Sequence, residues 1–135
     1  MIQASELRIG NWVKTNTQIV GTNSPEFGKI TQIYMDGFSV DYHYPSKWYE
    51  PIPLTPEILE KCGFEKVDDG ISPFYKLIIS KTEVISIEDD WSLGLNAKNE
   101  KSTQGYATNA NICQHLHQLQ NIYYALTGEE LNYQP

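Results

Sequence analysis

A C-x-H-x-H motif, Cys113 to His117, holds the residues of this chain best suited to metal binding or nucleophilic chemistry. Metal ligands on one helix need a spacing of three or four residues, which Cys113 and His117 have and His115 lacks. Two ligands do not complete a zinc site, and the other candidates, Cys62 and His43, are far away in the sequence. A catalytic Cys–His pair needs an exposed and activated thiolate, which the middle of a helix does not supply. We therefore expect neither a metal site nor a catalytic pair here.

An aromatic segment at residues 41–50 (DYHYPSKWYE) is the best candidate for a binding site. On a small β-barrel such rings line peptide or methyl-lysine pockets, and they can also stack on nucleobases. The alternative is that they pack in the core and at the barrel rims, where Tyr and Trp are common. Lys29 and Arg8 are the cations outside the segment that would best assist an anionic ligand. The predicted ligand- or partner-binding residues are Tyr42, Tyr44, Lys47, Trp48 and Tyr49.

The densest acidic cluster is Glu88-Asp89-Asp90, with Asp68-Asp69 upstream. Carboxylates of this kind could hold Mg²⁺ or Ca²⁺, but an EF-hand loop requires acids at alternate positions and a glycine at the sixth. A solvated turn is therefore the preferred interpretation. The chain also lacks the glycine-rich phosphate loops, the G-x-S-x-G nucleophile motif and the H-E-x-x-H zinc motif. We expect no cofactor and no enzymatic activity.

The charge of the chain limits its partners. The formal net charge is −7 and the pI about 4.8, with 10 Lys and Arg against 17 Asp and Glu. Non-specific nucleic-acid binding needs a basic face and is therefore disfavoured. The acidity fits solubility best, with a cationic protein partner or mimicry of a phosphate backbone as alternatives. The sequence shows neither a signal-peptide pattern nor an apolar run of the roughly 20 residues that span a membrane, so we expect a cytoplasmic protein.

The first 53 residues are typical of a small β domain. Strands are expected at residues 11–15, 28–35, 38–44 and 48–53. Asp36-Gly37 between two of them predicts a hairpin, because both residues readily adopt the positive φ of tight turns. Ile30 and Ile33 do not alternate cleanly, which indicates a β-bulge. These short strands, after a Leu-x-x-Gly-Asn-x-Val pattern, favour an SH3-like barrel, although an open antiparallel sheet would give the same pattern.

Residues 54–135 are typical of an α+β lobe. Thr55 at an N-cap, Pro56 at the first helical position and Gly63 after the end predict a short helix. The strands expected after it lie at residues 64–67, 74–79, 83–87 and 91–95. In the stretch 109–131, apolar residues recur at the spacing of one helix face, and Gly128 stands where a C-cap is expected. That face consists of Ile112, Leu116, Leu119, Tyr123 and Leu126.

The predicted fold class is therefore α+β, with two parts. Residues 1–53 form an N-terminal SH3-like small β-barrel. Residues 54–135 form an antiparallel sheet covered by a short helix and by a long C-terminal amphipathic helix, since the preceding strands need a cover. The two parts could also form one continuous domain.

Three segments carry a resemblance: ELRIGNWV at Glu6–Val13, EPIPLTPEILEKCGF at Glu50–Phe64 and HQLQNIYYALTGEEL at His117–Leu131. Together they resemble a family of small uncharacterised proteins found in Bacteroidota, often in phages, prophages and other mobile elements. The resemblance reaches both ends of the chain. It implies a short cytoplasmic protein of a mobile element, and it implies no activity, cofactor or functional residue.

The favoured function is a non-enzymatic protein-binding or adaptor module whose partner is a protein. One alternative is an anti-defence protein that sequesters a small nucleotide signal, which requires a pocket with aromatic rings and a few cations. Another is an acidic DNA mimic, which requires acids in regular surface rows. No membrane partner is expected. A homo-oligomer stays open, because the apolar face of the C-terminal helix could serve a dimer as well as its own sheet.

Overall fold

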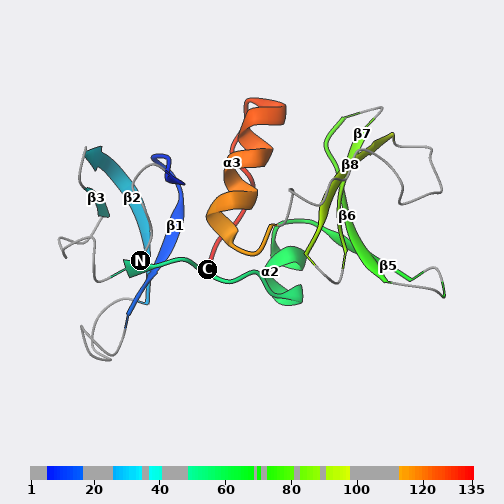
Figure 1. Cartoon of the computed structure of the whole chain (residues 1–135), viewed down its shortest axis with the longest axis horizontal. Coiled ribbons are helices and arrows are strands. Elements are labelled where there is room, and N and C mark those ends of the chain that lie inside the picture. The colour runs from blue at the N-terminus through cyan, green and yellow to red at the C-terminus, as the bar shows by residue number, and fades with distance from the viewer. Residues whose placement is uncertain are drawn as a thin grey trace. The chain divides into compact units, whose positions relative to one another are not determined.

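The computed structural model describes residues 6–16, 26–34, 37–40, 49–68, 70, 73–80, 83–88, 91–97 and 113–135. The chain divides into two compact units. Unit 1 comprises Met1–Leu54, His115–Leu131 and Pro135, and unit 2 comprises Thr55–Gln114 and Asn132–Gln134. Among the described residues, each unit contains a four-stranded antiparallel sheet and a helix (Figure 1). The α+β class predicted from the sequence is confirmed.

The sheet of unit 1 has the strand order β3-β2-β1-β4, and every neighbouring pair is antiparallel. Its strands are β1 (Trp12–Thr15), β2 (Phe27–Tyr34), β3 (Gly37–Val40) and β4 (Tyr49–Glu50). Side chains alternate between the two faces of the sheet. The inner face forms a core of buried residues, which are Leu7, Val13, Ile30, Phe38, Val40 and Tyr49.

The two edge strands of this sheet approach each other. The ring of Phe38 on β3 and the ring of Tyr49 on β4 are 6.0 Å apart, at an interplanar angle of 52°. Because β3 and β4 lie at opposite ends of the strand order, this contact requires the sheet to curl around its core. A flat sheet would hold these two strands about 14 Å apart, at the usual spacing between neighbouring strands.

The predicted bulge is present in β2. The register with β3 shifts between Ile30 and Gln32, so one extra residue sits in β2. Without it, Ile30 and Ile33 would point to opposite faces. With it, Ile33 pairs with the buried Phe38 and lies on the same side of the sheet as Ile30, although Ile33 is 36% exposed and Ile30 is buried.

The predicted antiparallel pairing of β2 and β3 is also present, but Gly37 belongs to the strand pair. Tyr34 pairs with Gly37. Residues 35 and 36 lie outside the described part of the chain. Gly37 itself is the first residue of β3.

Unit 2 contains a sequential antiparallel sheet in the order β5-β6-β7-β8. Its elements are α2 (Pro56–Lys61), β5 (Glu65–Val67), β6 (Phe74–Ile78), β7 (Glu83–Glu88) and β8 (Leu93–Ala97). The central strand β7 is buried on both faces from Val84 to Ile87. An apolar strand of this kind is expected where both faces of a sheet are covered.

Helix α2 follows its sequence signals. The hydroxyl of Thr55 accepts a hydrogen bond from the backbone N–H of Ile58 at 3.2 Å, which satisfies one of the free N–H groups of the first turn. Pro56 occupies the first turn, where no N–H is required. The helix ends before Gly63, whose φ of +96° is open to glycine and strained for other residues.

Helix α3 (Leu116–Thr127) begins later than predicted. The residues before it are extended: the N–H of Cys113 donates to the carbonyl of Trp91 at 2.8 Å. The N–H of Leu116 donates to the carbonyl of Ile52 at 2.9 Å. The backbone N–H groups of Cys113 and Leu116 thus bond to partners distant in sequence, and the described helix starts at Leu116. The C-cap is as predicted, with Gly128 at φ +73° and its N–H bonded to the carbonyl of Tyr124 at 2.8 Å.

The C-terminal helix, which was expected to cover the second sheet, groups with the first. Helix α3 belongs to unit 1 and contacts β1. Its apolar face is buried at Leu116 and Leu119, whereas Leu126 is 44% exposed. The reason is that a second, polar side of the helix meets the N-terminal segment. Within the part of the chain that the structure describes, no helix is long and apolar enough to span a membrane.

Candidate functional site

The aromatic segment predicted to bind a ligand is described only at its end. Tyr49 is 2% exposed and packs against Phe38 in the core of unit 1, so its ring is not accessible to a ligand. Tyr42, Tyr44, Lys47 and Trp48 lie outside the described residues, and their role stays a prediction.

The C-x-H-x-H motif does not lie on one helix, contrary to the expectation. Cys113 precedes α3, His115 is its N-cap, and only His117 is helical. The helical spacing between Cys113 and His117 therefore does not apply. Burial raises the pKa of both Cys113 and Cys62 to about 12, which keeps the two thiols protonated and unreactive at neutral pH.

The acidic cluster is also described only in part. Glu88 ends β7 and is half-buried, while Asp89 and Asp90 lie outside the described residues. Near the upstream acids, the carboxylate of Asp68 accepts a hydrogen bond from the N–H of Gly70 at 3.0 Å, as expected of a turn. Among the described residues, no three His, Cys, Asp or Glu side chains are grouped as metal ligands.

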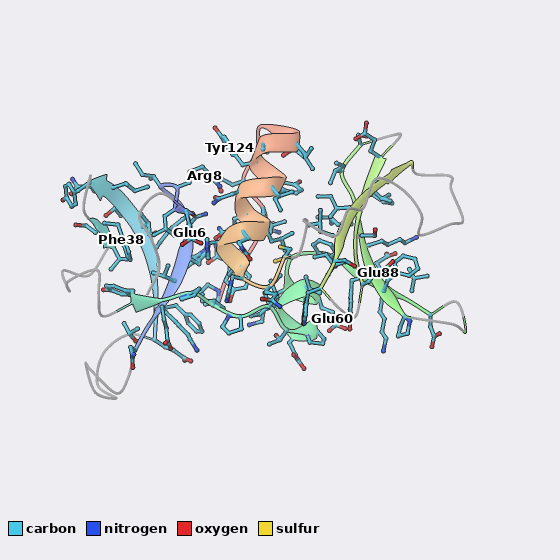
Figure 2. The ribbon with its side chains drawn as sticks, viewed as in Figure 1. Glu6, Arg8, Phe38, Glu60, Glu88 and Tyr124 are labelled. Carbon is cyan, nitrogen blue, oxygen red and sulfur yellow. The ribbon has the colours of Figure 1, made fainter. Side chains whose placement is uncertain are left out.

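A polar stripe on α3 faces the N-terminal segment Glu6–Trp12. Its members are spaced three or four residues apart, so they lie on one side of the helix. They are His117, Gln120, Asn121 and Tyr124. Figure 2 shows Glu6, Arg8 and Tyr124 in this region of unit 1.

Gln120 hydrogen-bonds through its side chain to the backbone at the start of β1. Its side-chain Oε1 accepts a hydrogen bond from the N–H of Trp12 at 2.9 Å, and its Nε2 donates to the carbonyl of Gly10 at 3.2 Å. The carboxamide presents one acceptor and one donor, as a backbone peptide group of an adjacent strand would. Gln120 is buried, and this pairing satisfies both of its polar atoms.

Asn121 continues the same pairing with the segment before β1. Its Oδ1 accepts from Nδ2 of Asn11 at 2.9 Å, and its Nδ2 donates to the carbonyl of Glu6 at 3.0 Å. The Oδ1 of the fully buried Asn11 in turn accepts from the N–H of Arg8 at 2.6 Å. Residues 6–12 are therefore fixed by amide groups from one helix.

Arg8 lies at the outer end of this stripe. Its guanidinium forms a bidentate ion pair with Glu130, with Nη2 and Oε2 3.0 Å apart. It also stacks over the ring of Tyr124, with Cζ 4.3 Å from the ring centroid, and donates to the carbonyl of Ile9 at 3.2 Å. The hydrogen bond from Arg8 lowers the pKa of the Glu130 carboxyl. One face of this guanidinium is thus covered by the Tyr124 ring, and both of its terminal nitrogens donate to Glu130.

His117 lies at the inner end of the stripe. Its side chain is 2% exposed, and neither ring nitrogen has a hydrogen-bond partner among the described residues. Oε1 of Glu6 is 3.9 Å from its Nε2, and the ring of His115 stacks at 5.8 Å between centroids. Burial lowers the pKa of His117, although the charge of Glu6 acts in the opposite direction. The imidazole is therefore neutral at pH 7.

The stripe ends in an exposed surface. Ile9 is 57% exposed and Tyr124 is 43% exposed, on either side of Arg8. We call these three residues the Arg8 surface. It combines apolar area with a fixed cation, and it contains no nucleophile or base. Its chemistry is that of recognition.

Comparisons with family models, with curated proteins and with solved structures give no match to this chain. The fold and the site therefore have to be judged on their own geometry.

Sequence reasoning missed the polar stripe. It identified Arg8 only as a free cation and did not assign Gln120 or Asn121 any role. One signal was available, since the stripe and its targets fall within two of the three segments that carry the family resemblance. Those segments meet in space, and the third contributes Ile52, whose carbonyl accepts the N–H of Leu116.

Proposed function

We propose that this protein is a non-enzymatic protein-binding module of a phage or other mobile element, acting in the cytoplasm. The observation that supports this function is the Arg8 surface. Arginine and tyrosine are over-represented among the residues that contribute most to protein–protein binding energy. Ile9 adds an exposed apolar side chain beside them, next to a polar rim that includes Glu130.

The Arg8 surface is pre-organised for binding. Arg8 has already lost most of its side-chain freedom to Glu130 and Tyr124. The backbone beneath it is held by Gln120 and Asn121. Binding to a rigid surface avoids the entropy cost of ordering flexible side chains and loops, so more of the contact energy contributes to affinity.

For unit 1 we propose an SH3-like small barrel. The antiparallel order β3-β2-β1-β4, the bulge in β2 and the contact between Phe38 and Tyr49 support a curled sheet of this type. In such a barrel the aromatic segment before Tyr49 is a second candidate for contacts with the partner.

Affinity purification from host cells tests the proposal. Three tagged forms are compared by quantitative mass spectrometry: the wild type, the double variant Ile9→Ser/Tyr124→Ser, and the control Ile78→Ser. The control removes an apolar side chain of similar exposure, 51%, from unit 2. Circular dichroism first verifies that all three are folded.

We expect one host or phage protein to be enriched with the wild type and with the control, and lost with the double variant. The purified partner should then bind the wild type at least tenfold more tightly than it binds the double variant. Equal enrichment with all three forms, or no stable partner with any of them, would overturn the assignment of the Arg8 surface.

A further inference from the structure

The outward face of the unit 1 sheet carries an unusual set of side chains. Along β1, the buried Val13 and Thr15 alternate with the half-buried Trp12 and Lys14. Along β2, the buried Gly28 and Ile30 alternate with outward-facing neighbours. Where these two strands pair, the outward residues are Trp12, Lys14, Phe27 and Lys29, which we call the aromatic–lysine platform.

In the strand register, aromatic and lysine side chains of the platform alternate both across and along the strands. Trp12 lies directly opposite Lys29, and Lys14 lies directly opposite Phe27. Each ring therefore has a lysine across the strand and another two residues along it, within reach of a long side chain. The Nζ of Lys29 lies 5.7 Å from the ring centroid of Trp12. Rings and ammonium groups thus alternate over a surface about two strands wide.

A third ring extends the face along β2. The bulge resets the alternation, so Gln32 and Tyr34 point outward with Ser39 of the paired strand. The hydroxyl of Tyr34 hydrogen-bonds to the side chain of Gln32 and accepts from Ser39 Oγ at 3.2 Å. This ring is held in place and remains half exposed.

The platform is locally cationic in an acidic protein. Each lysine has an acidic neighbour at the rim: Glu50 lies 3.4 Å from Lys14, and Glu130 is close enough for Lys29 to lower its pKa. The four side chains of the platform thus include two cations and no acid, whereas the whole chain carries a net charge of −7. An anionic group is therefore better accommodated on the platform than on an average part of this acidic surface.

We propose that the aromatic–lysine platform binds nucleotides, with bases stacked on its rings and phosphates paired with its ammonium groups. Rings on an exposed sheet face accept any base, because every base has a π-face, and lysines alongside match the phosphate backbone. The ligand is separate from the protein partner of the Arg8 surface. Binding is confined to this face, so duplex DNA, which needs a broad basic surface, is a poor ligand.

The test is a fluorescence anisotropy titration of the full chain with a fluorescein-labelled oligoadenylate of about 8 nucleotides, a length that one such sheet accommodates. Lys29→Glu removes a phosphate contact, and Lys66→Glu makes the same charge change on the exposed strand β5 of unit 2. Trp12→Ala removes a stacking ring and is read only after its fold is verified by circular dichroism.

We expect wild-type binding within the range of weak nucleic-acid contacts, at about 100 μM or tighter. Lys29→Glu should weaken it about tenfold and reduce its salt dependence, since one phosphate contact is lost. Trp12→Ala should weaken it by roughly 5- to 150-fold, the range found when a base loses its stacking partner. Lys66→Glu should have less than a twofold effect.

Glu50→Gln should raise the affinity for the oligonucleotide, whereas the substitutions above lower it. Its carboxylate competes with phosphate for Lys14, so its removal should strengthen binding about twofold to fivefold, in line with an exposed ion pair. A purely structural role of Lys14 and Glu50 would not produce a gain in affinity.

Two competitors identify the ligand. Displacement by AMP at a comparable concentration indicates a mononucleotide site, and displacement by unlabelled oligoadenylate alone indicates a strand; both support the platform. Absence of binding at about 100 μM, equal loss with Lys29→Glu and Lys66→Glu, or equal displacement by a polyglutamate peptide would overturn the proposal. The last result would assign the face to acidic peptides.

Discussion

Gln120 and Trp12 are 108 positions apart in the sequence, yet the side chain of one serves as strand partner to the backbone of the other. The carboxamide of Gln120 accepts the N–H of Trp12 and donates to the carbonyl of Gly10. Among the described residues, strand β4 pairs with β1 at Lys14 and Thr15. Gln120 thus occupies the part of the β1 edge that β4 does not reach, and it protects that edge from pairing with other chains.

Replacement of Gln120 by alanine should lower the free energy of unfolding of unit 1 by about 1–3 kcal/mol. The substitution leaves the N–H of Trp12 and the carbonyl of Gly10 without this partner in a partly buried setting. Urea unfolding measures the change. Gln134→Ala, at an exposed position near the end of the chain, is the matched control and should stay within about 0.5 kcal/mol. Equal effects of the two substitutions would refute the role assigned to Gln120.

Gly10→Ala should destabilise the protein more than Gly70→Ala. Both glycines have positive φ, +99° and +84°, so both substitutions carry backbone strain of about 1–2 kcal/mol. A Cβ at Gly10 would also lie 3.2 Å from Oε1 of Glu130, whereas nothing lies within 4 Å at Gly70. The difference in urea midpoint between the variants isolates the crowding at Gly10. A larger loss at Gly70 would contradict this account.

Unfolding should become easier as the pH falls below about 6.5. Burial holds the pKa of His117 in the folded state below its usual 6.5. At a pH between the folded-state pKa and 6.5, the unfolded chain therefore binds more protons than the folded one. The stabilisation is complete above 6.5 and is lost as the pH falls toward the pKa of the folded state. Urea unfolding between about pH 7.5 and 5.5 follows this change and stays above the range in which carboxylates titrate.

His117→Gln should flatten this pH dependence, and His115→Gln, two residues away, should retain most of it. Glu130 also has a lowered pKa, but its contribution is lost only below its usual value of 4.5 and is small because the side chain is exposed. An unchanged pH profile in His117→Gln would show that another group controls the transition.

The two thiols should react only after unfolding. Burial raises the pKa of Cys62 and Cys113 to about 12. We expect Ellman's reagent at pH 8 to label neither cysteine quickly in the folded protein and both in denaturant. Rapid labelling of the folded protein at one thiol would show that its segment opens readily.

The local elements could be predicted because their signals are local. Thr55, Pro56 and Gly63 set the ends of α2 through caps and φ preferences that act within a few residues. Ile30 and Ile33 indicated a bulge because both needed the same face. Gly37 was assigned to the turn but lies in β3, since Asp36-Gly37 is compatible with a turn but the register depends on pairing along the whole strand.

The partner of α3 could not be predicted from periodicity. The helical periodicity of α3 identifies its apolar face and leaves open which sheet that face contacts. Amides such as the buried Gln120 and the partly buried Asn121 look like surface residues in a sequence, because their hydrogen-bond partners lie 108 to 115 positions away. Tyr49 was predicted to bind a ligand, but its ring packs in the core, which was the alternative considered for its segment.

The main part of unit 2, Thr55–Gln114, is inserted between two stretches of unit 1, and this order has a consequence for synthesis. The ribosome produces Thr55–Gln114 in full before Leu116–Thr127 emerges. At that stage the nascent chain contains all strands of the first sheet, but the edge of β1 still lacks its hydrogen bonds to Gln120. The inserted sheet already has all its strands. Vectorial folding should reach the inserted unit first, and chaperone contact with the nascent protein should concentrate on residues 6–16 until the last helix arrives.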